Sequence, residues 1–126
     1  MIQKLYLVIP CYNEEEVLPE TSKQLRAKME TLMAAGKISK ESRIVFVNDG
    51  SKDRTWEIIK SLHKENPLFQ GIKLSRNRGH QNALLAGLMT VKEHCDMAIS
   101  MDADLQDDID AIDGMLEKYA EGCDIV

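Results

Sequence analysis

The stretch that decides the fold is MAISMDADLQ, residues 97–106, in which an apolar run passes directly into acidic residues. Residues 97–101 are predicted to form a buried strand, because the run is short and almost entirely apolar. In an extended backbone alternate side chains share a face, so Asp102, Asp104 and Gln106 would project together. Two carboxylates and an amide oxygen suit Mg²⁺ or Mn²⁺, and such an ion would grip a diphosphate. A nucleotide-linked substrate is therefore the leading hypothesis.

Three similar apolar runs precede this one, and each is followed by a helical pattern. Strands are predicted at residues 4–9, 43–47, 71–74 and 97–101, and helices at residues 17–35, 53–64, 81–94 and 108–121. Pro19 must lie in the first turn of the first helix, and Gly36 should end it. Strict alternation of strands and helices predicts an open, mostly parallel α/β sheet with helices on both faces.

The composition is that of one ordinary globular domain. The chain has 126 residues, of which 44% are hydrophobic and 29% charged, and its net charge of -5 argues against binding nucleic acid. Three widely spaced cysteines fit neither a disulfide framework nor a zinc site, so we expect a reducing, cytoplasmic environment. No apolar run approaches the roughly 18 residues needed to cross a bilayer. Residues 123–126 resemble the start of another strand, so we expect the sequence to be part of a longer protein.

Polar residues that look out of place occupy one kind of position along the chain. Each cluster follows a predicted strand and precedes a predicted helix; the clusters are residues 10–14, 48–51, 75–80 and 102–106. In open α/β sheets this edge holds the ligand crevice. One such cluster could arise by accident, but four indicate a ligand site.

Each cluster also has a plain structural interpretation. Residues 48–51 are turn formers and could be only a turn and helix cap, or Asp49 could accept hydrogen bonds from a nucleobase. Glu14 could merely favour a helix start, and Tyr12 could be core or an aromatic face against a base or ribose. Arg76 is a solvated loop cation by default, and a phosphate clamp if a diphosphate lies beside it.

Four motifs together resemble family 2 glycosyltransferases with the GT-A fold. They are VIPCYNEE (8–15), VNDGSKDRT (47–55), SRNRGHQNALLAGL (75–88) and MDADLQDD (101–108), in order and covering essentially the whole chain. The closest resemblance is to the branch that transfers sugars to dolichyl or polyprenyl phosphate.

The resemblance implies an inverting transfer from a UDP- or GDP-sugar with a divalent metal. It implies that Pro10, Tyr12 and Glu14 line the nucleoside pocket and that Asp49 reads the base. Asp102 would lie at the ribose or metal, and Asp104 and Gln106 would bind metal and diphosphate. Arg76 is a weaker correspondence. The acceptor would be a lipid phosphate or a cell-envelope glycan.

The resemblance also implies that residues 1–126 are a single Rossmann-like nucleotide-sugar-binding domain, ending before an acceptor-binding half. Membrane association, at the cytoplasmic face, would come only from segments absent from this chain. No residue can be named as the catalytic base, and we expect this piece alone to bind donor weakly and transfer little or no sugar.

Two other classes of protein share some of these features. A haloacid-dehalogenase-like phosphatase also places Asp-x-Asp after a strand, but too few residues follow Asp104 for its remaining motifs. A non-catalytic nucleotide-binding or interaction module would leave the clustering of four polar loops unexplained.

Overall fold

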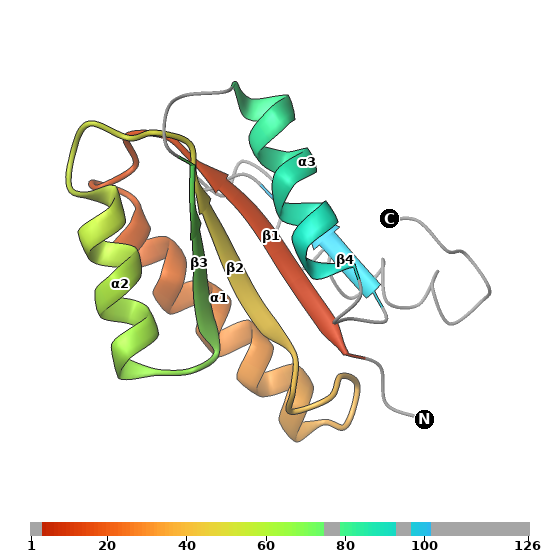
Figure 1. Ribbon diagram of the computed structural model, residues 1–126. Helices are drawn as coiled ribbons and strands as arrows, with labels where there is room; N and C mark the ends of the chain where they lie inside the picture. The colour runs from red at the N-terminus through yellow and green to blue at the C-terminus, as the bar shows by residue number, and fades with distance from the viewer. Residues whose placement is uncertain (1–3, 75–78, 93–96, 102–126) are drawn as a thin grey trace.

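The structure is a computed structural model that describes residues 4–74, 79–92 and 97–101. Its elements follow one another as predicted (Figure 1): β1 (Leu5–Cys11), α1 (Leu18–Ala34), β2 (Arg43–Asn48), α2 (Thr55–Glu65), β3 (Phe69–Lys73), α3 (His80–Val91) and β4 (Met97–Ser100). The fourth predicted helix, at residues 108–121, lies outside the described residues.

The four strands form one parallel sheet in the order β3-β2-β1-β4, which confirms the predicted fold class. The chain builds outward from β1 through β2 to β3, and then returns to add β4 on the other side of β1. In sheets of this kind the reversal of strand order opens a crevice at the carboxyl ends of the strands.

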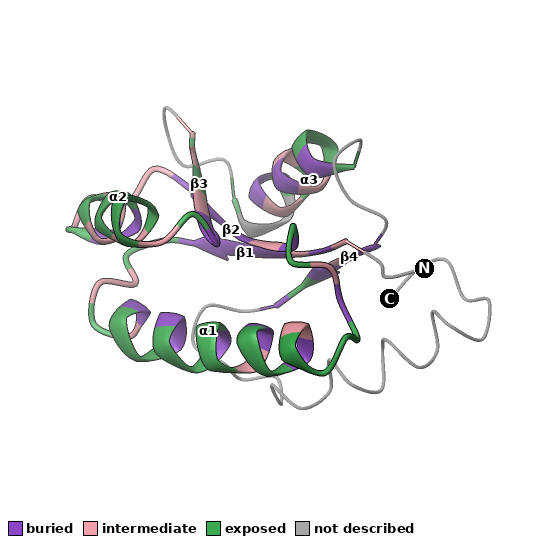
Figure 2. Ribbon diagram, turned by 90° about the horizontal axis from the view of Figure 1, so that it is seen from below, coloured by how far each residue is buried: buried purple, intermediate pink, exposed green. Residues whose placement is uncertain are grey.

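Helices cover both faces of the sheet (Figure 2). Leu7 and Ile9 of β1 pack with Leu25 of α1 and Ile59 of α2 in one buried cluster. On the opposite face, Val8 packs with Val45 and Val47 of β2 and with Ala83 and Val91 of α3. The alternation of β1 side chains between the two clusters explains why its sequence is almost continuously apolar.

The first helix begins and ends as its sequence predicts. Pro19 lies in the first turn of α1, where its missing N–H would have no intrahelical partner. Gly36 has φ of +71°, and the Lys37 N–H donates to the Leu32 carbonyl at 2.9 Å, which closes the helix in a Schellman arrangement.

Four predicted boundaries differ from the structure by two or three residues, and two of them have a clear physical reason. β3 begins at Phe69, where the prediction began at Gly71, and α3 ends at Val91, where the prediction ran to residue 94. β1 continues through Pro10 to Cys11, whereas the prediction stopped at Ile9. The last described bond between β1 and β4 runs from the Met101 N–H to the Val8 carbonyl at 3.2 Å, and Pro10, next on that side of β1, has no N–H to donate. The pairing with β2 uses the other residues of β1, and it continues to Cys11, opposite Asn48. α2 begins at Thr55, and not at Asp53, because the Asp53 carboxylate accepts the Thr55 N–H.

α3 approaches the sheet closely through Gly87. A Cβ at this position would lie 2.6 Å from Val8 Cγ1 and 2.7 Å from Val47 Cγ2. Both neighbours are β-branched side chains on strands, so they have little freedom to move aside.

We therefore expect Gly87→Ala to destabilise the fold by about 1–3 kcal/mol through overpacking, despite the better helix propensity of alanine. Denaturant unfolding would measure the loss. Val8→Ala should cost less in the Gly87→Ala background than in the parent chain, because it makes room for the new methyl group. Equal or greater stability of Gly87→Ala would contradict this packing.

Candidate functional site

The candidate site is built on the carboxyl ends of β1 and β2, which finish side by side. The register pairs Cys11 with Asn48, and the Asp49 N–H donates to the Cys11 carbonyl at 2.8 Å. The loops that follow, residues 12–17 and 49–54, therefore leave the sheet from the same height, next to each other (Figure 1).

Four hydrogen bonds join these two loops. In each, a backbone N–H of one loop donates to a side-chain oxygen across the gap: Asn13 N–H to Ser51 Oγ (2.9 Å), Glu14 N–H to Thr55 Oγ1 (2.8 Å), Glu15 N–H to Asp53 Oδ2 (3.2 Å) and Lys52 N–H to Asn13 Oδ1 (2.8 Å). Asn13 has φ of +53°, a left-handed conformation that asparagine tolerates better than most residues. The first loop is therefore fixed to the second by its own backbone.

Asp53 is the centre of this network. Its Oδ1 accepts the N–H of Thr55 at 2.9 Å and a short hydrogen bond from the Thr55 hydroxyl, and its Oδ2 accepts the Glu15 N–H. Partial burial acts to raise the pKa of Asp53, but the hydrogen bonds from Thr55 and Glu15 outweigh it and hold the pKa below its ordinary value.

This lowered pKa gives the fold a defined response to acid. The unfolded chain takes up the Asp53 proton first, so the stabilisation present above about pH 4 is lost as the pH falls through the lower folded pKa. We expect Asp53→Asn to lower the free energy of unfolding by about 1 kcal/mol at pH 7. The difference from the parent chain should shrink below pH 4. Glu41→Gln, at an exposed acid, serves as the control in the same denaturation series, and a difference that grows on acidification would contradict the assignment.

Four of the predicted site residues come together at this edge. Pro10 is buried in β1, and Tyr12, directly after this strand, is 41% exposed. Glu14 is half-buried, and Asp49 is 3% exposed at the end of β2. The other four, Arg76, Asp102, Asp104 and Gln106, lie outside the described residues. Met101, the last described residue, hydrogen-bonds to β1 and immediately precedes the acidic motif.

The structure shows which part of the turn-and-cap interpretation of residues 48–51 is correct. Asn48 makes the turn, since its Oδ1 accepts the Ser51 N–H at 3.2 Å and Gly50 has φ of +69°. The helix-cap interpretation is wrong for this segment, because α2 begins only at Thr55 and Asp53 accepts its first N–H. Asp49 is thus a buried carboxylate held at the end of a strand, and it does not cap the helix.

Sequence reasoning missed the residues that hold the loops together. In the sequence these residues are of types common in turns and at helix starts; they are Asn13, Ser51, Asp53 and Thr55. Asp-x-Thr before an apolar helix indicates at most a helix cap. Their partners lie 38–41 residues away in the chain, so no local pattern reveals the bonds.

Neither the thiol nor the acids of the described part form a metal site. No group of three or more His, Cys, Asp or Glu side chains suited to a metal ion occurs among the described residues. Burial raises the pKa of the Cys11 thiol well above its usual range, and Cys11 Sγ donates to the Ile9 carbonyl, so it is a packing residue. The proposed ligand set of two carboxylates and one amide oxygen has the hard-oxygen chemistry that Mg²⁺ and Mn²⁺ require.

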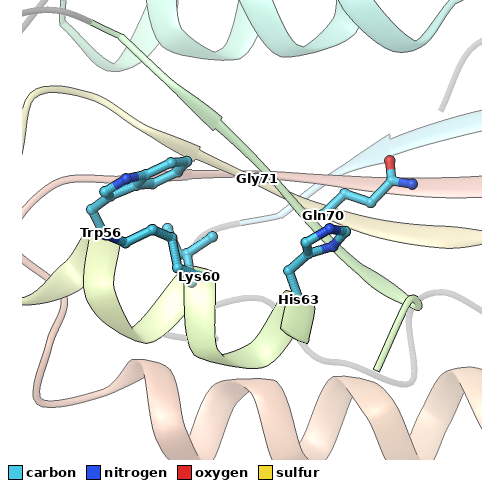
Figure 3. A pocket seen from close by; sticks show the side chains of 6 residues that line it. Trp56, Lys60, His63, Gln70 and Gly71 are labelled. Carbon is cyan, nitrogen blue, oxygen red and sulfur yellow. The ribbon is translucent and has the colours of Figure 1, made fainter. Parts of the chain in front are cut away.

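A pocket of about 360 Å³ lies elsewhere, between α2 and β3 (Figure 3). Trp56, Lys60 and His63 of α2 line it together with Gln70 and Gly71 of β3. The Lys73 Nζ lies 5.8 Å from the Trp56 ring centroid, and the His63 Nδ1 is 2.7 Å from the Phe69 carbonyl oxygen. These contacts fasten α2 to the sheet. Within the described part of the chain, no helix is both long and apolar enough to span a bilayer.

A parallel sheet with reversed strand order and polar loops at its carboxyl edge is a Rossmann-like α/β fold. The chain belongs to the glycosyl transferase family 2, whose family model matches residues 6–126. This membership favours the transferase hypothesis over the phosphatase.

Curated relatives match almost the whole chain. The chain is 52% identical over 122 residues to the glycosyltransferase YkoT of Bacillus subtilis, covering 97% of this chain and 36% of that protein. It is 42% identical over 125 residues to a prophage bactoprenol glucosyl transferase homolog of Escherichia coli, covering 98% and 38%. It is 39% identical over 121 residues to an undecaprenyl-phosphate 4-deoxy-4-formamido-L-arabinose transferase of Shewanella sediminis, covering 95% and 34%. The chain therefore spans little more than a third of these relatives.

Two solved structures share the fold. A Pyrobaculum calidifontis mannosyltransferase in complex with GDP-Man and Mn²⁺ superposes with a TM-score of 0.63 at 19% identity, covering 82% of this chain and 28% of the other. Residues 1–349 of Staphylococcus aureus TarS superpose with a TM-score of 0.70 at 19% identity, covering 94% and 32%. Both likenesses support a GT-A architecture for this chain.

Proposed function

We propose that this chain is the donor-binding domain of an inverting glycosyltransferase. The enzyme would move a sugar from a UDP- or GDP-sugar to a polyprenyl phosphate, using Mg²⁺ or Mn²⁺, at the cytoplasmic face of the membrane. The observation that carries the proposal is the pair of joined loops at the carboxyl ends of β1 and β2, with Tyr12 exposed on one and Asp49 held at the base of the other.

The buried Asp49 suits recognition of a nucleobase. An ionised carboxylate is only an acceptor, so it selects groups that present N–H donors, as the pairing edges of uracil and guanine do. At 3% exposure the carboxylate is largely shielded from water, which strengthens a hydrogen bond to a ligand. Tyr12, exposed on the neighbouring loop, offers an aromatic face to the base or ribose.

The diphosphate is assigned to the later motifs. Asp102, Asp104 and Gln106 would hold the metal ion, and the ion would supply positive charge to stabilise the departing nucleoside diphosphate. Arg76 would add a guanidinium whose forked donors match phosphate oxygens. The Mn²⁺ and GDP-Man bound to the Pyrobaculum mannosyltransferase support a metal-dependent donor site.

The relatives support the choice of acceptor. Bactoprenol and undecaprenyl phosphate appear in the names of the Escherichia coli and Shewanella proteins. A polyprenyl phosphate presents a phosphate oxygen as the nucleophile for the anomeric carbon of the sugar. The residues that would bind and orient it are not assigned to this chain.

Calorimetric titration with UDP, GDP and their sugars, with and without Mn²⁺, tests the donor site. Asp49→Asn should weaken binding of the preferred nucleotide by about tenfold, because an amide replaces an acceptor-only carboxylate. Glu30→Gln, which removes an exposed acid on α1, should leave the affinity unchanged. Equal binding by the parent chain and a folded Asp49→Asn variant would contradict the role of Asp49.

The metal assignment has its own test. Asp104→Ala should abolish the increase in nucleotide affinity that Mn²⁺ produces, while metal-independent binding persists, because one of two ligand carboxylates is lost. Asp113→Ala provides a nearby acid-to-alanine control. If Asp104→Ala retains the full effect of Mn²⁺ on affinity, residues 102–106 are not the metal site.

A further inference from the structure

We propose that Asp53 and Thr55 are positioning residues of the nucleoside pocket. They fix the backbone of Glu14 and Glu15 against the loop that carries Asp49, without touching the nucleotide themselves. The inference rests on the donor site proposed above, and it deepens that proposal by naming what holds the site in its binding geometry.

The two side chains form a continuous hydrogen-bonded chain between the loops. The Glu14 N–H donates to Thr55 Oγ1 at 2.8 Å, and the Thr55 hydroxyl donates in turn to Asp53 Oδ1. The second carboxylate oxygen, Oδ2, accepts the Glu15 N–H at 3.2 Å. Two consecutive N–H groups of the first loop are therefore held by one carboxylate–hydroxyl pair.

The hydroxyl of Thr55 is buried and fully used by these hydrogen bonds. Its side chain has no exposed surface, and its hydroxyl is already both a donor and an acceptor. It cannot bind a ligand directly, and a buried hydroxyl or N–H that lost its partner would be costly. The position therefore demands a hydroxyl.

A second connection makes the fixation complete. Asn13 and the segment around Ser51 exchange two hydrogen bonds, of 2.9 Å and 2.8 Å. Fixed at three successive residues, 13 to 15, the first loop cannot pivot relative to the second. Tyr12 immediately precedes these anchors and Asp49 lies at the base of the partner loop, so the spacing of the two proposed base contacts is set before any nucleotide arrives.

Helix capping alone does not account for this arrangement. A cap needs only to accept an N–H of its own helix, as Asp53 Oδ1 does from Thr55 at 2.9 Å. The bonds to Glu14 and Glu15 instead reach across 41 and 38 residues to a different helix start.

Asp53→Asn separates the two roles. The retained Oδ1 can still accept both bonds from Thr55 and preserve the cap, whereas the new amide NH₂ would face the Glu15 N–H, donor against donor. Thr55→Val removes the hydroxyl at nearly constant volume, and Thr55→Ser restores it. Thr31→Val is the matched control, because the Thr31 hydroxyl bonds only within α1, to the Ala27 carbonyl.

The experiment combines two measurements on each variant, both made well below its unfolding temperature. Amide hydrogen exchange reports the Glu14 and Glu15 N–H groups, and calorimetry with UDP or GDP and Mn²⁺ reports affinity. We expect Thr55→Val and Asp53→Asn to speed exchange at these amides and to raise the Kd about tenfold. Thr55→Ser and Thr31→Val should match the parent chain.

Loss of stability must be separated from loss of positioning. Leu32→Ala opens a cavity near the far end of α1 and lowers the unfolding temperature, and it should leave the Kd unchanged. If Thr55→Val does not fold, Asp53→Asn carries the test by itself.

The possible outcomes point to different conclusions. Faster exchange with weaker binding in the folded variants, and rescue by serine, would support the positioning role. If the variants bind as tightly as the parent chain, the positioning role is overturned and the donor site stands. If the parent chain binds neither nucleotide, the proposed function fails, and this inference fails with it.

Discussion

The hydrogen bond from the Asp49 N–H to the Cys11 carbonyl sets the height at which the two loops of the candidate site leave the sheet. It extends the parallel β1–β2 pairing by one residue and brings both strands to an end at the same height. Parallel strands place all their carboxyl ends at one edge, so the loops that follow must meet there. The buried clusters on the two faces hold the sheet between its helices.

The first loop satisfies its backbone N–H groups by bonding to side chains across the gap. Loops near a crevice must satisfy their N–H groups without regular secondary structure. Here three consecutive N–H groups of the first loop, from Asn13 to Glu15, bond to oxygens of Ser51 and Asp53 on the second loop and of Thr55 at the start of α2. The same bonds that satisfy the backbone also fix the geometry of the site. Stability and ligand geometry are therefore coupled at this edge, and Asp53 contributes to both.

Much of the fold could be predicted from the sequence because its signals are local. Apolar runs, the proline in the first turn of α1 and Gly36 at its end identify the elements within a few residues. The order of polar clusters also predicted that Pro10, Tyr12, Glu14 and Asp49 would share one edge. The end of β1 and the start of α2 were harder to predict. The first depends on which neighbouring strand the backbone of Pro10 is turned toward, and the second depends on the hydrogen bonds of the Asp53 side chain. The bonds between the loops could not be predicted, since each joins residues far apart in sequence through common turn-forming side chains.

The anchoring of Glu14 and Glu15 through their main-chain N–H groups has a consequence for how such a protein can diversify. The Glu15 side chain takes no part in those bonds, so it can be exchanged without loosening the frame that carries it, whereas the Glu14 side chain is assigned to the nucleoside pocket. Mutation can then explore new contacts on a preserved scaffold, whereas Thr55 and Asp53 have no such latitude. Variation among descendants should accordingly be tolerated at position 15 and excluded at positions 53 and 55.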